Sequence, residues 1–565
     1  MLLVHNAADS SSRFSRYLRE LLLLEGFMAI EEIDAAELPA RLAQSPGETI
    51  LLARMSLPSA TTDALVSHLH QGGRLIALQP DQLLLKRLGC VPAFAAIRKG
   101  MMTFAGSDLL AGLPLDPVQV VVPTVRWSAP VDAATLATLV DVDDAATQTA
   151  AISHLRVGAG DAVLIGFDLA KAVIRLRFGD PQQDDLYVRS NDAILRPHEL
   201  LIGTLDPRQL RIAQTDILTA LLGRLVETFD PQPRIWHYPD PGQRSALIQT
   251  SDDDWSTIDQ FEHMLSVLKN YNARATFYIV PNSNVTTAHL DRWEQDGHTF
   301  SVHPAADSEA NYGPMPEEPQ SLWVPEMVRK NVERHRAQYG RDVKTIRNHA
   351  IRWAHYLEVP RIHAELGVRA EANYFCVPPF PVGFLCGSGR PAPFVEETGE
   401  IIDHYQIPSA WTEEVLLHPT HSASMNWMVG KAQNETNAII QRATQRYHTP
   451  VTVNSHPVSF ATYSQPLIED NWRQARELNV PIIGADEWMD WADARRALTL
   501  VREGNQWVLQ VGRAVPSMTM LIPVASGETD KTEQIWGRNY AAIRLTNLIP
   551  GERRIVSGDR LGASA

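Results

Sequence analysis

Apolar residues in the first 230 positions alternate between short runs of strand length and longer stretches with helical spacing. The runs MLLVHNA, ETILLAR and GRLIALQP have the length of buried strands, whereas SRYLRELLLLEGF and ATTDALVSHLHQGG carry apolar residues at helical spacing. We expect Ser10–Ser12 to cap the first of these helices and Gly26 to end it. Strands that alternate with helices predict an α/β fold with a parallel sheet and crossover helices.

Two later runs, VQVVVPTVRW and DAVLIGFDLAKAVIRLRFG, extend this first domain to about residue 230. Gly158-Ala159-Gly160 is a weak phosphate-loop signal because no glycine-rich fingerprint opens a helix there, and it predicts a hairpin turn. Residues 227–243, ETFDPQPRIWHYPDPGQ, contain four prolines and predict a linker.

Strand and helix patterns resume after this linker, in ALIQTS, IDQFEHMLSVLKNY, ATFYIV, HTFSVH, VTVNSH and VPIIGA. The stretch 240–496 is long enough for a β/α barrel. Beyond it, WVLQVG, SMTMLIPV and YAAIRLTNL are short alternating strands separated by Gly and Pro turns. The patterns therefore predict three domains: a parallel-sheet domain over 1–230, a barrel over 240–496 and a small β-domain over 497–565.

The composition argues against several classes of function. The 565 residues are 44% hydrophobic, and the formal charge of −15 argues against a nucleic-acid partner. Cys90, Cys376 and Cys386 form no C-x-x-C pair, so we expect three small buried residues rather than disulfides or a thiolate zinc site. The chain lacks a secretory leader pattern and any clean apolar run near about 18 residues, so we expect a soluble, cytoplasmic protein without membrane segments, or an extracellular one if a leader was removed.

Three aspartates, Asp252, Asp253 and Asp254, stand where the first predicted barrel strand ends. A divalent cation would relieve their mutual repulsion, and a carboxylate left off the metal would serve as a base. The alternative is a helix N-cap, because Asp254 precedes the helical stretch WSTIDQFEHM.

Later strand ends carry further polar side chains. His303 ends HTFSVH, with Asp307 four residues on, and His456 ends VTVNSH. Arg347 and His349, spaced by two in TIRNHAIRW, share one face of an extended segment. Functional residues of parallel β/α folds gather at the C-terminal ends of strands, so this ordered series predicts one site.

The stretches RSALIQTSDDDW, RATFYIV and GHTFSVHP resemble the opening of the polysaccharide deacetylases with the NodB-homology fold. That family has a T-F-D-D-G stretch, an A-T-F-F strand and then G-H-E-I-x-x-H. The resemblance implies a distorted β/α barrel, and metal-dependent hydrolysis of an N-acetyl or O-acetyl group on a carbohydrate. A larger branch of deacetylase-like proteins, which adds a flavodoxoid, amidotransferase-like front domain and a β-tail, is similar in IRNHAIRW, AEANYF, CGSGRPAPF, IIDHYQ and PIIGADEWMDWADAR. The front domain of this chain lacks an amidotransferase catalytic signature.

The resemblance also implies roles for individual residues. Asp252 aligns with the family's catalytic base, Arg347 with the arginine that braces the base, and His456 with the general acid. Asp253 aligns with the metal-binding aspartate and His303 with the first metal histidine.

The chain departs from the family at the second metal histidine, where it has Asp307. Either Asp307 binds the metal itself, or His349 enters from the next strand; we favour His349 because a proline in HPAAD redirects the chain. Zn²⁺ is the favoured ion, with Co²⁺, Ni²⁺ and Mn²⁺ as alternatives. Asp254 replaces a family glycine and precedes Trp255, and both would narrow the groove.

Several further residues have two interpretations. Asp403 either orients His456 or lies at the surface, and Trp353, Tyr374 and Trp427 either stack on a sugar or fill the core. At the level of the whole protein, the favoured function is a metal-dependent hydrolase that removes an acyl group, foremost N-acetyl, from a carbohydrate. The alternatives are a non-catalytic carbohydrate-binding protein on a degenerate barrel and an amidase for a small N-acyl molecule.

Overall fold

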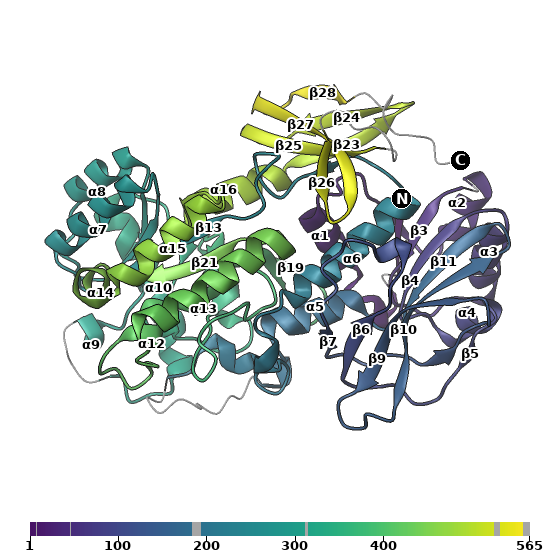
Figure 1. Ribbon diagram of the computed structural model, residues 1–565, viewed down its shortest axis with the longest axis horizontal. Helices are drawn as coiled ribbons and strands as arrows, with labels where there is room; N and C mark the ends of the chain where they lie inside the picture. The colour runs from purple at the N-terminus through teal and green to yellow at the C-terminus, as the bar shows by residue number, and fades with distance from the viewer. Residues whose placement is uncertain (7, 46, 184–193, 311–314, 525–531, 557–565) are drawn as a thin grey trace.

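The computed structural model describes residues 1–6, 8–45, 47–183, 194–310, 315–524 and 532–556. Figure 1 shows the N-terminal sheet at one end of the molecule, the sheet that contains β13 at the other, and the C-terminal strands above them. Helices α1 (Ser15–Glu25), α5 (Leu169–Phe178) and α6 (Gln214–Phe229) lie between the two large sheets.

The N-terminal sheet has the strand order β2-β1-β3-β4-β11-β10-β9-β6-β7. Its parallel half consists of β2 (Glu31–Asp34), β1 (Leu2–His5), β3 (Thr49–Leu52), β4 (Arg74–Leu78) and β11 (Gly160–Ile165). The crossover helices of this half are α1, α2 (Leu38–Gln44) and α3 (Ser59–His70), as the alternating pattern predicts.

The other half of this sheet is antiparallel, which the predicted all-parallel sheet did not include. It consists of β10 (Gln148–Val157), β9 (Ala134–Asp141), β6 (Gly100–Phe104) and β7 (Val118–Val120). Gly158, at a φ of 61°, turns the chain between β10 and β11, so the predicted hairpin turn is confirmed.

The start of α1 differs from the predicted serine cap. Ser10–Ser12 form a 3-10 turn whose first N–H groups face Asp9, and Asp9 accepts a hydrogen bond from Ser11 N. The helix begins only at Ser15 and ends at Gly26, whose φ of 91° suits glycine.

The second large sheet has the order β18-β19-β17-β16-β15-β14-β13-β21-β20, with β22 paired to β13. Every pairing is parallel except that of β18 with β19. The sheet curls into a half-barrel, and a bridge between Phe375 and Ser409 connects the segment after β17 to β20. The bounds are β13 (Leu247–Asp252), β14 (Thr276–Ile279), β15 (Thr299–Val302), β16 (Thr345–Ile346), β17 (Ala370–Glu371), β18 (Ala392–Val395), β19 (Ile401–Gln406), β20 (Ser409–Thr412), β21 (Val451–Ser455) and β22 (Ile482–Gly484).

Helices follow most of these strands, so this part of the chain is a mixed α/β fold. Every residue of β13, β14 and β21 is buried, as expected for parallel strands covered on both faces. The helices are α7 (Ile258–Asn270), α8 (Thr287–Trp293), α9 (Asp307–Ala310), α10 (Gln320–Tyr339), α11 (Glu358–Glu365), α12 (Glu413–Leu417), α13 (Val429–Arg442), α14 (Pro457–Ser459), α15 (Gln465–Glu477) and α16 (Ala485–Arg496).

The C-terminal strands form two small antiparallel sheets. One has the order β12-β25-β27-β26, from β12 (Arg234–Ile235), β25 (Val515–Pro523), β27 (Arg538–Leu548) and β26 (Thr532–Ile535). The other has the order β23-β24-β28, from β23 (Leu498–Glu503), β24 (Gln506–Val511) and β28 (Arg553–Val556). Because β12 lies within residues 227–243, the predicted linker contributes a strand to this region.

The N-terminal part is joined to the half-barrel by buried charges. Arg390 Nη1 donates to Glu25 Oε1 at 2.7 Å, and Arg177 Nη2 donates to the backbone oxygen of Arg390 at 2.6 Å. These charges can be buried because they are paired, and removal of one partner would lower the free energy of unfolding.

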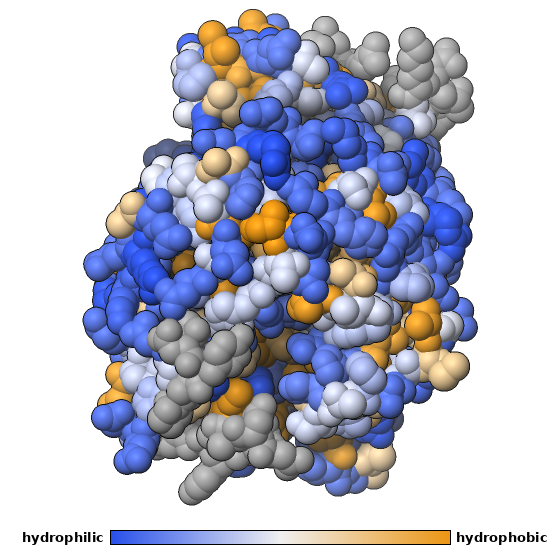
Figure 2. All heavy atoms as spheres, turned by 90° about the vertical axis from the view of Figure 1, so that its left-hand side faces the viewer, coloured by the Kyte–Doolittle hydropathy of each residue, from blue (hydrophilic) through white to orange (hydrophobic). Residues whose placement is uncertain are grey.

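In the described ranges no helix has the length and apolar character needed to cross a lipid bilayer. Figure 2 shows a mainly hydrophilic surface on the half-barrel side, with hydrophobic side chains in scattered groups.

Candidate functional site

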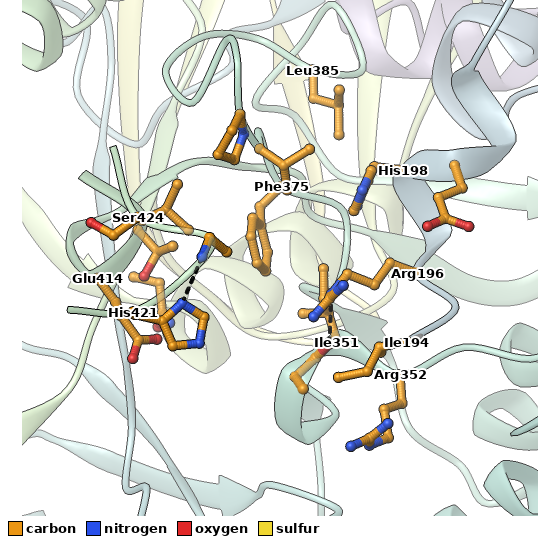
Figure 3. Close-up of a pocket in the computed structure, with 18 of the residues that line it drawn as sticks. Ile194, Arg196, His198, Ile351, Arg352, Phe375, Leu385, Glu414, His421 and Ser424 are labelled. Atoms are coloured by element: carbon orange, nitrogen blue, oxygen red, sulfur yellow. Dashed lines mark hydrogen bonds between the residues drawn. The ribbon is translucent and has the colours of Figure 1, made fainter. Parts of the chain in front are cut away.

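A cavity of about 860 Å³ lies at the C-terminal ends of β13, β15 and β21. Its polar side contains Asp252, Asp254, His303, His349 and His456. Opposite them lies the segment 194–210, which comes from the N-terminal part of the chain. Figure 3 shows Arg196 and His198 of this segment facing the cavity, with Phe375 and the loop that contains His421 on the other side.

Asp252 is the last residue of β13 and is held by two side-chain donors, a guanidinium and an amide. Arg347 Nη1 donates to its Oδ1 at 3.1 Å, and Asn454 Nδ2 donates to its Oδ2 at 2.8 Å. Arg347 also donates to Thr250 Oγ1 at 2.9 Å and to Ser409 Oγ at 2.8 Å. The structure thus places Arg347 where the resemblance put it, as a fixed brace for Asp252.

The Nδ1 atom of each histidine lies beside an oxygen, with a hydrogen bond in His303 and His456 and an ion-pair contact in His349. His303 Nδ1 donates to the backbone oxygen of Arg347 at 2.6 Å. His456 Nδ1 lies 2.8 Å from Glu413 Oε1, and His349 Nδ1 lies 3.1 Å from Glu309 Oε1. An acceptor at Nδ1 fixes the ring and leaves Nε2 directed into the cavity, as in imidazoles that bind metals.

The three Nε2 atoms converge on the carboxylate of Asp254. His303 Nε2 lies 3.2 Å from Asp254 Oδ1, while His456 Nε2 and His349 Nε2 lie 3.6 Å and 4.0 Å from Oδ2. Asp254 reaches this position through a backbone with a φ of 42°, a left-handed conformation that glycine adopts freely and aspartate tolerates.

Asp253 does not join this group, in contrast to the role that the resemblance implied. Its side chain is fully buried, with Oδ1 accepting from Ser256 N at 3.0 Å and Oδ2 from Val280 N at 3.4 Å. Both oxygens thus bind backbone N–H groups within the fold, and Asp253 is not among the residues that line the cavity. Asp254 is also not the helix cap, because Thr257 and Gln260 form a capping box for α7.

Asp307 also lies away from the histidines. It is the first residue of α9 and forms an exposed ion pair with Lys330. Glu309, two residues on, is the acidic residue of this segment that contacts His349. Of the two sets considered for the metal, the structure brings His349 to the site and leaves Asp307 at the surface.

The electrostatics of the group follow from these contacts. Burial alone would lower the pKa of His456, but the charges of Glu413 and Asp254 raise it well above its usual 6.5. Burial would raise the pKa of Asp254, yet the imidazoles of His456, His303 and His349 lower it well below 3.8. Both shifts favour charged forms inside the cavity.

Some residues were not singled out in the sequence. Glu413, which orients His456, follows β20, and Glu309 lies in the short helix α9; neither stands in a sequence pattern that marks it. Asp403 is 77% exposed and pairs with Arg369, so it does not orient His456. Trp353 and Tyr374 are buried and pack against each other, whereas Trp427 lies under the Lys431 ammonium. Cys90, Cys376 and Cys386 are buried and free, as predicted.

The donor chemistry around Asp254 fits a divalent cation. His303 Nδ1 donates to a carbonyl, and its Nε2 lies 3.2 Å from Asp254 Oδ1, a buried oxygen that accepts no hydrogen bond. A shared cation or a shared proton between these two atoms would satisfy both. In the part of the chain that the structure describes, no group of three or more His, Cys, Asp or Glu side chains has the geometry to hold a metal ion.

Glu371, beneath this site on β17, gives the fold a pH dependence. Burial raises the pKa of its carboxyl from 4.5 to about 8. Between these values the unfolded chain loses the proton that the folded chain keeps, so the free energy of unfolding falls by up to about 1.4 kcal/mol per pH unit. We expect Glu371→Gln to flatten this slope in urea denaturation between about pH 5 and about pH 8. An unchanged slope in the variant would assign the effect to other groups.

Residues 240–373 match the family model described as polysaccharide deacetylase. The chain contains a polysaccharide deacetylase domain. The matched range runs from before β13 through β17 and includes Asp252, Asp254, His303, Arg347 and His349. Glu413 and His456 lie beyond the matched range.

Several solved structures are distantly similar to this chain. Agd3, described as a novel carbohydrate deacetylase, is 10% identical over 98% of both chains, with a TM-score of 0.42. The Xyl-CE4 domain of a xylanase from the hindgut metagenome of Trinervitermes trinervoides is 12% identical over 44% of this chain and 92% of its own, with a TM-score of 0.27. A family 4 acetyl xylan esterase from Clostridium thermocellum, solved with a cobalt ion, is 13% identical over 44% and 91%, with a TM-score of 0.27. No curated protein matches the chain.

Proposed function

We propose that this protein is a metal-dependent hydrolase that removes an acyl group, foremost N-acetyl, from a carbohydrate. The observation that carries the proposal is the convergence of three anchored imidazole Nε2 atoms on Asp254, beside the braced carboxylate of Asp252. Three neutral or charged imidazoles around one carboxylate are a usual arrangement for metal binding and acid–base chemistry.

Asp254, His303 and His349 would hold the cation. His303 and His349 follow the adjacent strands β15 and β16, and their ring centroids are 5.5 Å apart. With Asp254 they provide one oxygen and two nitrogen donors, a set that suits Zn²⁺ and also accepts Co²⁺, Ni²⁺ or Mn²⁺. When bound, the ion would act as a Lewis acid at the acyl oxygen and make water a better nucleophile near neutral pH.

Asp252 and His456 would carry the protons. Asp252 accepts the proton of the attacking water, and Arg347 and Asn454 hold its carboxylate in one orientation. His456 Nε2, 3.8 Å from Asp252 Oδ2, donates a proton to the departing amine. Hydrolysis thus breaks the acyl carbon–nitrogen bond and yields a carboxylic acid and the free amine.

A second candidate is an amidase for a small N-acyl molecule. The cavity of about 860 Å³ lies within the size range of small-molecule sites, and the segment 194–210 covers one side of it. Apolar residues are frequent on that side: Ile194, Leu201, Ile202, Leu205 and Leu210.

Acetate release distinguishes these functions. Purified full-length chain, stripped by a chelator and reloaded with Zn²⁺, would be incubated with an N-acetylated chitooligosaccharide, with N-acetylglucosamine and with a simple N-acetyl amine. Zn²⁺-dependent release from the oligosaccharide supports the carbohydrate deacylase, and release from the simple amine alone supports the amidase. Failure to bind a stoichiometric cation, together with no release, would contradict both and favour the non-catalytic alternative.

Glu413 is expected to position His456 for this reaction. Its Oε1 accepts from His456 N at 2.8 Å and contacts Nδ1 at the same distance. We expect Glu413→Ala to lower kcat by about 10–100-fold with little change in KM, since lost orientation of a proton donor removes part of its 10²–10⁴-fold contribution. Glu413→Gln keeps an acceptor for Nδ1 and should restore part of kcat. Equal losses in both variants would show that the contact does not orient the ring.

A further inference from the structure

A second cavity, of about 540 Å³, lies in the N-terminal part of the chain and has no role in the deacylase site. It is bounded by Arg54–Ser56 after β3, by Gln79–Leu83 after β4, and by Ser11 after β1. Arg126, between β7 and β8 (Trp127–Ser128), completes the polar lining. These strands belong to the sheet that Figure 1 places at the opposite end of the molecule from β13.

The cavity sits where the order of the parallel strands reverses. The chain passes from β1 through α1 to β2 on one side, and from β2 through α2 to β3 on the other side of β1. The C-terminal ends of β1 and β3 therefore diverge into helices on different sides. In open parallel sheets, ligands bind in the crevice at such a reversal.

Arg54 and Arg126 line this crevice with guanidinium N–H groups that no described residue binds directly. Both side chains are half-buried, and neither guanidinium has a hydrogen-bond acceptor or an ion-pair partner in the described part of the chain. Asp81, the carboxylate of the lining, accepts from Leu84 N at 2.8 Å and from Leu57 N at 2.9 Å. Asp9 likewise accepts from Ser11 N and Ser56 N.

Charged groups of both signs lie behind the lining. Asp9 and Asp168 face Arg54 at longer range, and Lys171 adds a further positive charge. Asp168 Oδ1 accepts from Lys171 N at 3.0 Å, at the start of α5. The nearby carboxylates thus bind backbone N–H groups, while the arginine N–H groups are left for a ligand.

The rim of the cavity is shaped for an organic group. Gln79 follows β4 with a φ of 43°, and it is fixed by bonds from its N to Ile165 O at 2.7 Å and from its Nε2 to Pro123 O at 3.0 Å. Met55 and Leu85 are buried behind the lining, and the Phe94 ring is fully exposed and supplies apolar surface at the rim. A planar or ring-shaped group beside Phe94 would bury part of this surface.

We propose that this cavity binds a small organic phosphate. Two guanidinium groups match the charge of about −1.5 to −2 on a phosphate monoester better than they match a single carboxylate. The planar N–H fork of arginine binds phosphate oxygens in pairs, and the apolar rim accommodates the organic part. The proposal does not rest on the deacylase function, because no residue is shared between the two sites.

Calorimetric titration of the full chain tests it. The probes are inorganic phosphate, adenosine 5′-monophosphate and glucose 6-phosphate, with adenosine, glucose and acetate as counterparts that lack phosphate. We expect one equivalent of an organic phosphate to bind, inorganic phosphate to compete, and the counterparts to bind at least about 10-fold more weakly, the order expected when a hydrogen bond to a charged group is lost.

Variants then assign the binding to the arginines. Arg54→Gln and Arg126→Gln should each weaken binding by about 10-fold or more, and Arg54→Lys, which keeps the charge without the fork, should give an intermediate loss. Arg156→Gln is the matched control: it removes the same charge from an exposed position on β10, where Arg156 pairs with Asp161 at 3.1 Å. Absence of phosphate binding, equal binding of acetate, or an equal loss in Arg156→Gln would overturn the proposal.

Discussion

Replacement of Asp252 by asparagine is expected to reduce kcat by about 10²–10⁴-fold while the divalent cation stays bound. Asparagine keeps the size of the side chain and an oxygen that can accept from Arg347, but its amide cannot take a proton from water. Asp252 lies 3.9 Å from His303 Nε2, whereas Asp254 lies 3.2 Å away, so the proposed ligands remain in place. Single-turnover acetate release and metal content would be measured on the same preparation.

Asp259→Asn provides the control for this variant, because Asp259 is an exposed aspartate in the first turn of α7. It should leave kcat within about two-fold, since exposed substitutions usually change little. Activity of Asp252→Asn near that of the unmodified protein would remove Asp252 from the role of base. Loss of the metal together with activity would instead make Asp252 a ligand.

The positions of the strands could be predicted because the parallel strands are buried on both faces. Continuous apolar runs such as ALI before Asp252 and VTV before His456 give β13 and β21, and the strand ends then bring distant residues together. The antiparallel half of the N-terminal sheet was missed for a related reason. Strand β9 has a mixed exposed and buried pattern, which is a weaker signal than a continuous apolar run.

The residues proposed to bind the cation could not be predicted exactly, because their positions depend on the backbone conformation after the strand ends. In an extended strand Asp252 and Asp254 would share a face, and alignment to the family placed Asp253 at the metal. The chain leaves the strand at Asp252 and turns through positive φ values at Asp254 and Trp255, which directs Asp254 toward His303. Glu413 and Glu309 could not be predicted from the sequence either, because the histidines that they contact are 43 and 40 residues away.

The second large effect concerns these ligands: Asp254→Asn is expected to weaken Zn²⁺ binding by at least about 100-fold. Loss of an outer partner of a metal ligand already costs about 10–100-fold in affinity, and Asp254 would be a direct ligand. The amide that replaces the carboxylate carries no charge to balance the cation, although it keeps the size of the side chain. Competition with a chromogenic chelator at fixed pH would give the affinity.

Asp253→Asn and Asp307→Asn make this test specific. Asp253 accepts backbone N–H groups from Ser256 and Val280, so its amide should lower the free energy of unfolding by about 1–3 kcal/mol and leave Zn²⁺ affinity nearly unchanged. Asp307, paired with Lys330 at the surface, should change neither quantity. If Asp253→Asn released the metal while Asp254→Asn retained it, Asp253 would be the ligand, as the alignment with the family implies. The turn after β13 would then have to rearrange when the ion binds. If Zn²⁺ binding were lost only in Asp307→Asn and kept in Asp254→Asn and Asp253→Asn, the cation would lie beside α9 instead of between His303 and Asp254.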